Sequence, residues 1–470
     1  MDNPNDLKQK VLKGSISLTL RQLLASALSL VSVFVIARTL GPALYGVVSA
    51  SLGIFYFFRW TIRFGLGTYI VRQPDLKDEE VEQILYLYGL GGLLICVGLW
   101  LLAPAFSWWI GRSEITLLLR LLLPALWIDL IGSVSMSLLQ RQLRFDLVSL
   151  VESVSMIVNY LLSVPIVLMY SSVLGPILGV VLQYVVATGL SIFFMPVKWR
   201  NRLSWKVLEA PVRYGISYYS SNCFFNLREL TVPLFVSRLA GIEAVGYTNI
   251  TIRMAHQLLL LRKVIRRMSI GVMAKVVDNA AATRSALTQG MVYQALLMGA
   301  VCALFGSCAT WLIPAVFGEK WLLSAQLFPL IGIATLVGAI FDLHSATLYA
   351  VAKNRDVSIL NVAYIGSLWL ACVVLIPPLG FWGYGVAELV ALPSYFLVHR
   401  SVTKLFGSPD YSLAAWLVAT SLPPLLAGIF LPPTVALVLF CLSYGLLFLT
   451  SNRARNTALK LVEAVQLKSA

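Results

Sequence analysis

The stretch ARTLGPALYGVVSA at residues 37–50 returns in altered form as SRLAGIEAVGYTNI at residues 237–250. Both copies hold an arginine followed by two glycines at the same spacing: Arg38, Gly41 and Gly46 in the first copy, and Arg238, Gly241 and Gly246 in the second. Glycine accepts positive φ and lets two helices approach closely. We interpret each copy as a short turn between two helices, and we expect the following helix to start directly after the second glycine.

The composition identifies a membrane protein. Hydrophobic residues make up 59% of the 470 residues, charged residues make up 12%, and the mean hydropathy is +0.83. Apolar runs of about 20 residues, enough to cross about 30 Å of hydrocarbon, recur along the sequence. The sequence predicts fourteen spans, at 14–37, 44–68, 83–105, 115–139, 147–170, 175–197, 212–237, 244–270, 286–312, 321–350, 357–377, 380–399, 412–430 and 433–450.

The net charge of +15 reflects topology, and we expect no nucleic-acid partner. With the N-terminus inside, most lysines and arginines fall in inner segments. The outer segments hold only Arg38, Arg112, Arg238 and Lys320. The positive-inside rule therefore predicts that both termini face the cytoplasm of a plasma (inner) membrane. We expect no cleavable signal peptide, because the N-terminal segment is polar and the first apolar run is full length.

Weaker sequence similarities extend the repeat along the chain. IGRSE and FGEKW precede the fourth and tenth spans, and RFDLVSL and NRDVSIL precede the fifth and eleventh. Two six-helix halves with the same orientation would be related by a pseudo-twofold axis along the membrane normal. The predicted parts are an N-terminal six-helix half (1–197), a basic amphipathic cytoplasmic connector (198–213), a C-terminal six-helix half (214–405), and two further helices with a cytoplasmic tail (406–470).

The pattern of six, six and two helices resembles a known family. Together with the turn ARTLGPALYG, the end of the second span at IRFGLGTYIVRQ (62–73) and the stretch AVGYTNITIRMAHQLL, it is similar to the Wzx-type polysaccharide flippases. These form the polysaccharide transport branch of the multidrug/oligosaccharidyl-lipid/polysaccharide (MOP) exporter superfamily. The resemblance covers essentially the whole chain. It implies an all-α MOP flippase fold of about fourteen transmembrane helices.

No catalytic motif is present, and we expect no enzyme. The sequence lacks GxSxG, a P-loop and HExxH, and its three histidines (His256, His344 and His399) are scattered. All six cysteines lie in predicted helices without a CxxC pair, which favours a packing role. We therefore expect no metal site and no cofactor, although coupling to Na⁺ or H⁺ stays open.

Charges at membrane depth are the informative residues, because each costs about 2.5 to 3.5 kcal/mol on insertion scales. The candidates for a cationic substrate-binding cavity are Arg21, Arg59, Arg63, Arg228 and Arg253. They lie on the first two helices of each half, which the resemblance implies face a central cavity. Guanidinium groups offer forked donors to phosphate oxygens. Alternatively, Arg63 snorkels to the interface, and Arg228 with Glu229 forms a structural ion-pair network.

Four acids also lie within the predicted membrane spans: Asp129, Glu229, Asp342 and Glu388. Each either pairs with an arginine or binds a coupling ion, and the sequence leaves both roles open. Tyr218 and Trp60 are among the deep aromatic residues that could stack on sugar rings.

These features predict a flippase that moves an undecaprenyl-pyrophosphate-linked oligosaccharide from the inner to the outer leaflet by alternating access. Its expected partners are this lipid-linked substrate, membrane lipids, and a polysaccharide polymerase with export machinery. One alternative is a cation-coupled multidrug exporter of the same superfamily, which would need acids rather than arginines. A membrane polysaccharide polymerase or ligase is a further alternative, but it would need a large outer loop.

Overall fold

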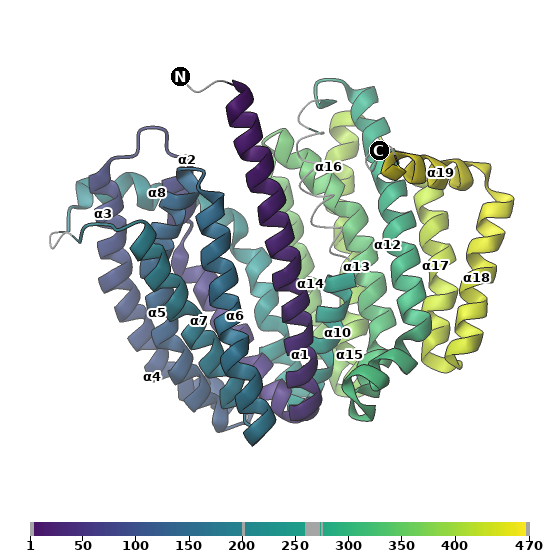
Figure 1. Ribbon diagram of the computed structural model, residues 1–470. Coiled ribbons are helices and arrows are strands. Elements are labelled where there is room, and N and C mark those ends of the chain that lie inside the picture. The colour runs from purple at the N-terminus through teal and green to yellow at the C-terminus, as the bar shows by residue number, and fades with distance from the viewer. Residues whose placement is uncertain (1–3, 200–202, 259–272, 274–275, 467–470) are drawn as a thin grey trace. The chain divides into compact units, whose positions relative to one another are not determined.

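The computed structural model describes residues 4–199, 203–258, 273 and 276–466, and within these ranges all regular structure is helical (Figure 1). The chain divides into two compact units, Met1–Gly246 and Tyr247–Ala470. The predicted all-α membrane fold is confirmed. The predicted four-part organisation stays a prediction, and part of the connector (200–202) lies outside the described residues.

The first unit begins with long α-helices and ends in short irregular helical turns. Its elements are α1 (Pro4–Arg63), α2 (Leu66–Arg72), α3 (Asp78–Tyr86), the π-helix η1 (Leu87–Gly91), α4 (Gly92–Ile110), α5 (Glu114–Arg141), α6 (Phe145–Tyr170), α7 (Leu174–Phe194), α8 (Trp205–Leu227), the 3₁₀-helix η2 (Arg228–Leu230), the π-helix η3 (Val232–Val236) and α9 (Ser237–Ala240).

The second unit follows from α10, which starts just before the division. Its elements are α10 (Ile242–Leu258), α12 (Ala280–Phe317), the 3₁₀-helix η4 (Glu319–Trp321), α13 (Leu322–Ala350), α14 (Asn354–Leu379), α15 (Trp382–Ala391), the 3₁₀-helix η5 (Leu392–Tyr395), α16 (Phe396–Phe406), α17 (Ser412–Phe430), α18 (Pro433–Thr450) and α19 (Asn452–Gln466).

Within the described residues, ten helical segments are long and apolar enough to cross a membrane. They correspond to the predicted spans other than the first, seventh, eighth and twelfth. The first and second predictions both fall in α1, on either side of a kink at Gly41, and residues 259–270 of the eighth lie outside the described part. The seventh and twelfth are interrupted, because Pro233 falls in η3 and Pro393 in η5, where each lacks a backbone N–H to donate. The count of fourteen stays a prediction.

The repeated turn has the same backbone conformation in both copies. Gly41 has φ 69° and ψ 176°, and Gly241 has φ 89° and ψ 170°. The expectation that the next helix starts after the second glycine is wrong, because the helix resumes at Pro42 and at Ile242, directly after the first glycine. Only the first glycine adopts the positive φ that breaks the helix.

The second glycine of each copy serves a close helix crossing instead. A Cβ on Gly46 would collide with the carbonyl oxygen of Ile242, and a Cβ on Gly246 would collide with the carbonyl oxygen of Pro42. Residues 42 and 242 are equivalent in the repeat, so the two copies pack against each other reciprocally. This reciprocity is what a pseudo-twofold relation between the two turns requires.

Small residues also let the longer helices pack. In the first unit α4, α5, α6 and α7 lie side by side (Figure 1), and Gly179 of α7 sits against Asn159 and Ser163 of α6. In the second unit Gly428 of α17 lies against the backbone of Gly306 in α12. Such close approach raises van der Waals contact, which drives helix association where lipid replaces water.

Candidate functional site

The end of α1 in the first unit determines the position of the candidate residue Arg63. The sequence predicts a helix through residue 68, but α1 ends at Arg63 because Phe64 and Gly65 both have left-handed φ, at 49° and 71°. The hydroxyl of Tyr88 donates a hydrogen bond to the carbonyl oxygen of Arg63. Arg63 is therefore the last residue of a membrane-spanning helix, and the chain turns directly after it.

Two candidate arginines share one buried aspartate. Asp129 on α5 accepts hydrogen bonds from Arg59 Nε (2.9 Å, Oδ2) and Nη2 (3.3 Å, Oδ1). It also accepts from Arg63 Nε (3.2 Å, Oδ2) and Nη2 (2.8 Å to each oxygen). Arg59 and Arg63 are four residues apart on one helix face, so the shared carboxylate offsets their repulsion. We call Arg59, Arg63 and Asp129 the arginine cluster.

The arginine cluster carries a formal charge of +1, because two guanidinium groups face one carboxylate. The Asp129 side chain is 8% exposed, whereas those of Arg59 and Arg63 are 29% and 34% exposed. The Arg59 guanidinium also lies 4.8 Å from the centre of the Tyr184 ring, a cation–π contact. The acid is buried while both cations keep surface that a ligand can reach.

A pocket of about 390 Å³ opens beside this cluster. Its charged lining residues are Arg63 and Arg72, and no aspartate or glutamate is among the described residues that line it. Trp60 and Tyr218 supply aromatic surface, and the other lining residues are Gly65, Gly67, Thr68, Val71, Tyr88, Ser133, Met136, Ser137 and Gln140. A pocket of this size with few convergent polar groups suits an anionic small-molecule group.

The wall formed by α2 is fixed by hydrogen bonds. Tyr69 donates to the Glu80 carboxylate at 2.8 Å, and burial together with this bond raises the pKa of Tyr69, so the phenol keeps its proton. Arg141 donates to the carbonyl oxygens of Ile70 (2.9 Å) and Pro74 (2.9 Å) at the end of α2. These hydrogen bonds hold α2 in place, and Arg72 on this helix lines the pocket.

The remaining predicted arginines lie elsewhere in the chain. Arg21 falls in α1, but its side chain is outside the described part of the chain. Arg228 and Glu229 lie in η2, whose backbone packs close to Gly53 of α1. Arg253 lies half-buried in α10 of the second unit. Their predicted roles in substrate binding stay predictions.

The two predicted acids of the second unit differ in environment. Asp342 lies half-buried in α13. Glu388 in α15 is 1% exposed and accepts hydrogen bonds from the hydroxyls of Tyr364 and Tyr384. Two phenol donors stabilise a buried carboxylate without neutralising it.

The interpretation of the histidines as scattered is wrong for two of them. His344 Nε2 and His399 Nδ1 both hydrogen-bond to the hydroxyl of Tyr411, at 2.6 Å and 2.8 Å. His344 lies in α13, His399 in α16 and Tyr411 directly before α17. No spacing in the sequence signals this cluster, because three separate helices bring it together.

Comparison with solved structures identifies the class of fold. The structure is similar to the lipid II flippase MurJ in an inward closed conformation, with a TM-score of 0.74, 13% sequence identity and coverage of 92% of this chain and 97% of that chain. It is also similar to an inward-facing multidrug resistance MATE family transporter of the MOP superfamily, with a TM-score of 0.66, 16% identity and coverage of 80% and 94%. The fold is therefore that of the MOP exporters.

Sequence comparison gives the family. Residues 35–326, more than half of the chain, match the family described as "Polysaccharide biosynthesis protein", and the chain belongs to this family. It is 22% identical to the lipopolysaccharide biosynthesis protein WzxC of Escherichia coli K12, over 90% of this chain and 87% of that protein. It is 22% identical to the teichuronic acid biosynthesis protein TuaB of Bacillus subtilis 168, over 76% and 71%. These findings confirm the resemblance seen in the sequence.

Proposed function

We propose that this protein is a flippase that moves a lipid-linked oligosaccharide, carried on undecaprenyl pyrophosphate, from the inner to the outer leaflet by alternating access. The family membership supports a role in polysaccharide biosynthesis. The relatives named for lipopolysaccharide and teichuronic acid biosynthesis support the export of a surface glycan. The fold likeness to a lipid II flippase supports a lipid-linked cargo rather than a soluble one.

The observation that carries this proposal is the arginine cluster beside its pocket. A guanidinium has five N–H donors, and the bonds to Asp129 use only some of those on Arg63. The pyrophosphate would bind between Arg63 and Arg72, both of which line the pocket. Trp60 and Tyr218 would offer aromatic faces to the first sugar.

An inside-negative membrane potential would drive this transport outward. Moving one charge across 100 mV is worth about 2.3 kcal/mol, so the two charges of a pyrophosphate diester would contribute about 5 kcal/mol. We propose that the protein acts as a transporter, which the transporters among its relatives and structural neighbours support.

The orientation follows from the distribution of basic residues. We infer that both termini face the cytoplasm of the plasma membrane, because the basic segments would otherwise lie outside. The C-terminal end of α1, at Arg63, would then lie on the inner side. The pocket beside the arginine cluster would open toward that side. A polysaccharide polymerase and export machinery would receive the cargo on the outer side.

The acids are proposed to have separate tasks. Asp129 would hold the two arginines together, since it pairs with both. Glu388 would be the candidate for a coupling proton, because it is buried and bonded to two tyrosines. Glu229 and Asp342 would take part in local charge pairing. A Glu388→Gln variant that keeps wild-type transport, with the same dependence on an imposed pH gradient, would remove Glu388 from this role.

A multidrug exporter of the same superfamily is the second candidate, favoured by the fold likeness to MATE transporters. Such a protein would bind cations, which the formal +1 charge of the arginine cluster would repel. The two candidates therefore differ in the charge of the cargo.

Reconstituted transport tests the proposal. Proteoliposomes would contain a fluorescent undecaprenyl-pyrophosphate oligosaccharide, with and without an imposed potential. We expect outward movement that an inside-negative potential accelerates and that Arg63→Gln slows at least tenfold. Arg120→Gln is the matched control, because Arg120 lies on α5 but stacks on Trp100, 4.1 Å from its ring centre. Movement of cationic dyes without movement of any of several glycolipids would contradict the proposal.

A further inference from the structure

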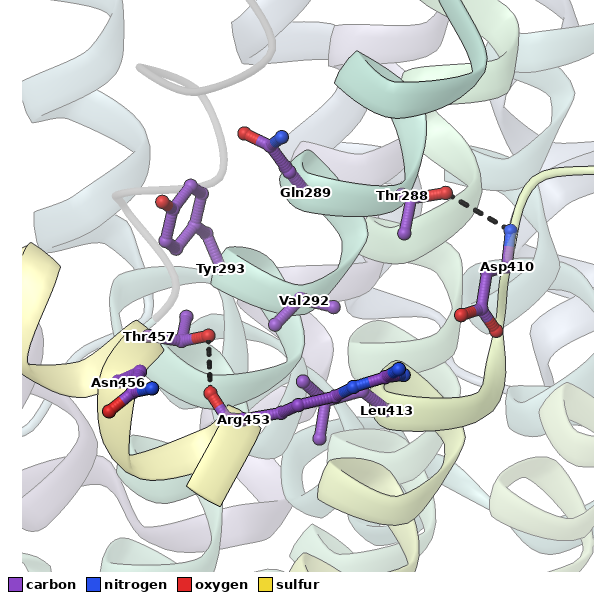
Figure 2. Close-up of a pocket in the computed structure, with 9 residues that line it drawn as sticks. All are labelled: Thr288, Gln289, Val292, Tyr293, Asp410, Leu413, Arg453, Asn456 and Thr457. Atoms are coloured by element: carbon purple, nitrogen blue, oxygen red, sulfur yellow. Dashed lines mark hydrogen bonds between the residues drawn. The ribbon is translucent and has the colours of Figure 1, made fainter. Parts of the chain in front are cut away.

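The second unit contains a polar cavity that shares no residue with the arginine cluster. It has a volume of about 340 Å³ and lies between the start of α12, the segment before α17, and α19. Figure 2 shows its lining residues: Thr288, Gln289, Val292, Tyr293, Asp410, Leu413, Arg453, Asn456 and Thr457. Because three separate elements form it, the cavity is a product of the fold and not of one helix end.

One wall carries a fixed negative charge. The backbone N–H of Asp410 donates to Thr288 Oγ1 at 3.0 Å, which ties the segment to α12 (Figure 2). The Asp410 carboxylate accepts the backbone N–H of Ser412 at 2.9 Å. Hydrogen bonds from Ser412 lower the pKa of Asp410, so the carboxylate is ionised at neutral pH. The Asp410 side chain is exposed and lines the cavity.

The opposite wall carries a positive charge. α19 is anchored by Ala454, which is fully buried in the core of the second unit, so the neighbouring Arg453 is held at the cavity. Figure 2 shows its guanidinium directed toward the segment that bears Asp410. Among the described residues, no carboxylate lies within 4 Å of Arg453. Arg455, two residues further along α19, instead donates a hydrogen bond from Nη2 to Asn452 Oδ1 at 2.9 Å.

Further donors line the same cavity. The Tyr293 hydroxyl and the Asn456 amide make no hydrogen bond to any residue in the described part of the chain, and both side chains line the cavity with Arg453. Val292 and Leu413 supply an apolar floor. Leu413 begins a face of α17 that continues to Trp416, whose side chain is 69% exposed and apolar.

We propose that this cavity binds the headgroup of a zwitterionic phospholipid that carries a primary amine, such as phosphatidylethanolamine. The phosphate would bind the Arg453 guanidinium, which Figure 2 shows on the Asp410 side of the cavity. The ammonium group would donate to Asp410. The acyl chains would follow the exposed apolar face of α17 that starts at Leu413.

The separated charges select this class of ligand. An anionic lipid without an amine, such as phosphatidylglycerol, has the same phosphate charge but no ammonium group to pair with Asp410, which disfavours it. A choline headgroup has the right charges but no N–H to donate to the carboxylate. The site therefore distinguishes three lipids that share the same phosphate and acyl chains.

Native mass spectrometry of the detergent-solubilised full-length protein tests the proposal. The probes are phosphatidylethanolamine, phosphatidylcholine and phosphatidylglycerol with identical chains. We expect phosphatidylethanolamine to bind about tenfold more tightly than the other two. Arg453→Gln should weaken its binding about tenfold, while Asp410→Asn should abolish the preference for phosphatidylethanolamine over phosphatidylglycerol. Both side chains are exposed, so neither variant should lose its fold.

The matched controls are Arg455→Gln on the same helix and Asp278→Asn at another exposed position of the second unit. Both should bind lipid as the wild type does. An equal loss in Arg455→Gln and Arg453→Gln, or an unchanged preference in Asp410→Asn, would overturn the proposal. Glycerophosphoethanolamine, the soluble headgroup without acyl chains, distinguishes a lipid ligand from a soluble one. If it binds as tightly as the lipid, the ligand is soluble and the lipid assignment is wrong.

Discussion

The two copies of the repeated turn, both in the first unit, share one backbone conformation, whereas the two units bury different polar groups. Gly41 and Gly241 have nearly the same φ and ψ, and Gly46 and Gly246 contact each other's turn reciprocally. The first unit buries an aspartate between two arginines, whereas the second buries a glutamate between two tyrosines. The two turns therefore keep the same backbone geometry, whereas the buried charged groups differ between the two units.

This difference indicates how the repeat and the chemistry are separated. Helix crossings depend on small side chains and backbone conformation, which both copies keep. Charge at membrane depth is costly and persists only where partners and a task maintain it. The following variants break either the shared geometry or the charge difference.

Asp129→Asn should have the largest effect on stability. It leaves Arg59 and Arg63 on one helix face without their acid, and loss of one partner of a buried ion pair costs about 3 to 5 kcal/mol. We expect a clear loss of folded protein in thermal unfolding measured in detergent.

Glu388→Gln in the second unit is the comparison, because its amide oxygen can still accept a tyrosine hydrogen bond. A variant Asp129→Asn as stable as the wild type would mean that the arginines do not need the carboxylate.

Gly46→Ala should have the next largest effect. The added Cβ collides with the carbonyl oxygen of Ile242, a backbone atom that cannot rotate away, and overpacking of this kind costs about 2 kcal/mol. Gly246→Ala should match it, because its Cβ meets Pro42 in the same way. Gly98→Ala, where no atom lies within 4 Å of the added Cβ, should be neutral or stabilising in the same unfolding measurement. Very different losses at the two glycines would show that the turns are not equivalent.

Tyr411→Phe should have the smallest effect of the three. It removes the hydroxyl that bonds to both His344 and His399, and the unpaired buried imidazole costs about 1 kcal/mol or slightly more. Thermal unfolding should detect the loss, whereas Tyr170→Phe, at a side chain 70% exposed, should change nothing. Equal stability of the two variants would show that the hydroxyl is dispensable to the second unit.

The sequence predicts the membrane class and the repeated turn, since these depend on apolar length and on glycine position, and its resemblance to the Wzx-type flippases indicates the superfamily. It also names Arg59, Arg63 and Asp129 among the candidates, but it cannot pair Asp129 with the two arginines, because that contact joins residues 70 positions apart. The end of α1 at Arg63 was missed, since Phe64 is not a residue expected at positive φ. The meeting of His344 and His399 on Tyr411 has no local sequence signal at all.

The central claim is that the formal +1 charge of the arginine cluster binds an anionic lipid carrier. The most direct measurement is the affinity of undecaprenyl pyrophosphate for the detergent-solubilised wild type, Arg63→Gln, and the double variant Arg63→Gln/Asp129→Asn. The single variant has a neutral cluster, while the double variant returns it to +1 through Arg59 alone. We expect the single variant to bind at least tenfold more weakly and the double variant to recover most of that loss. Equal affinities for all three, or no recovery in a folded double variant, would contradict the claim.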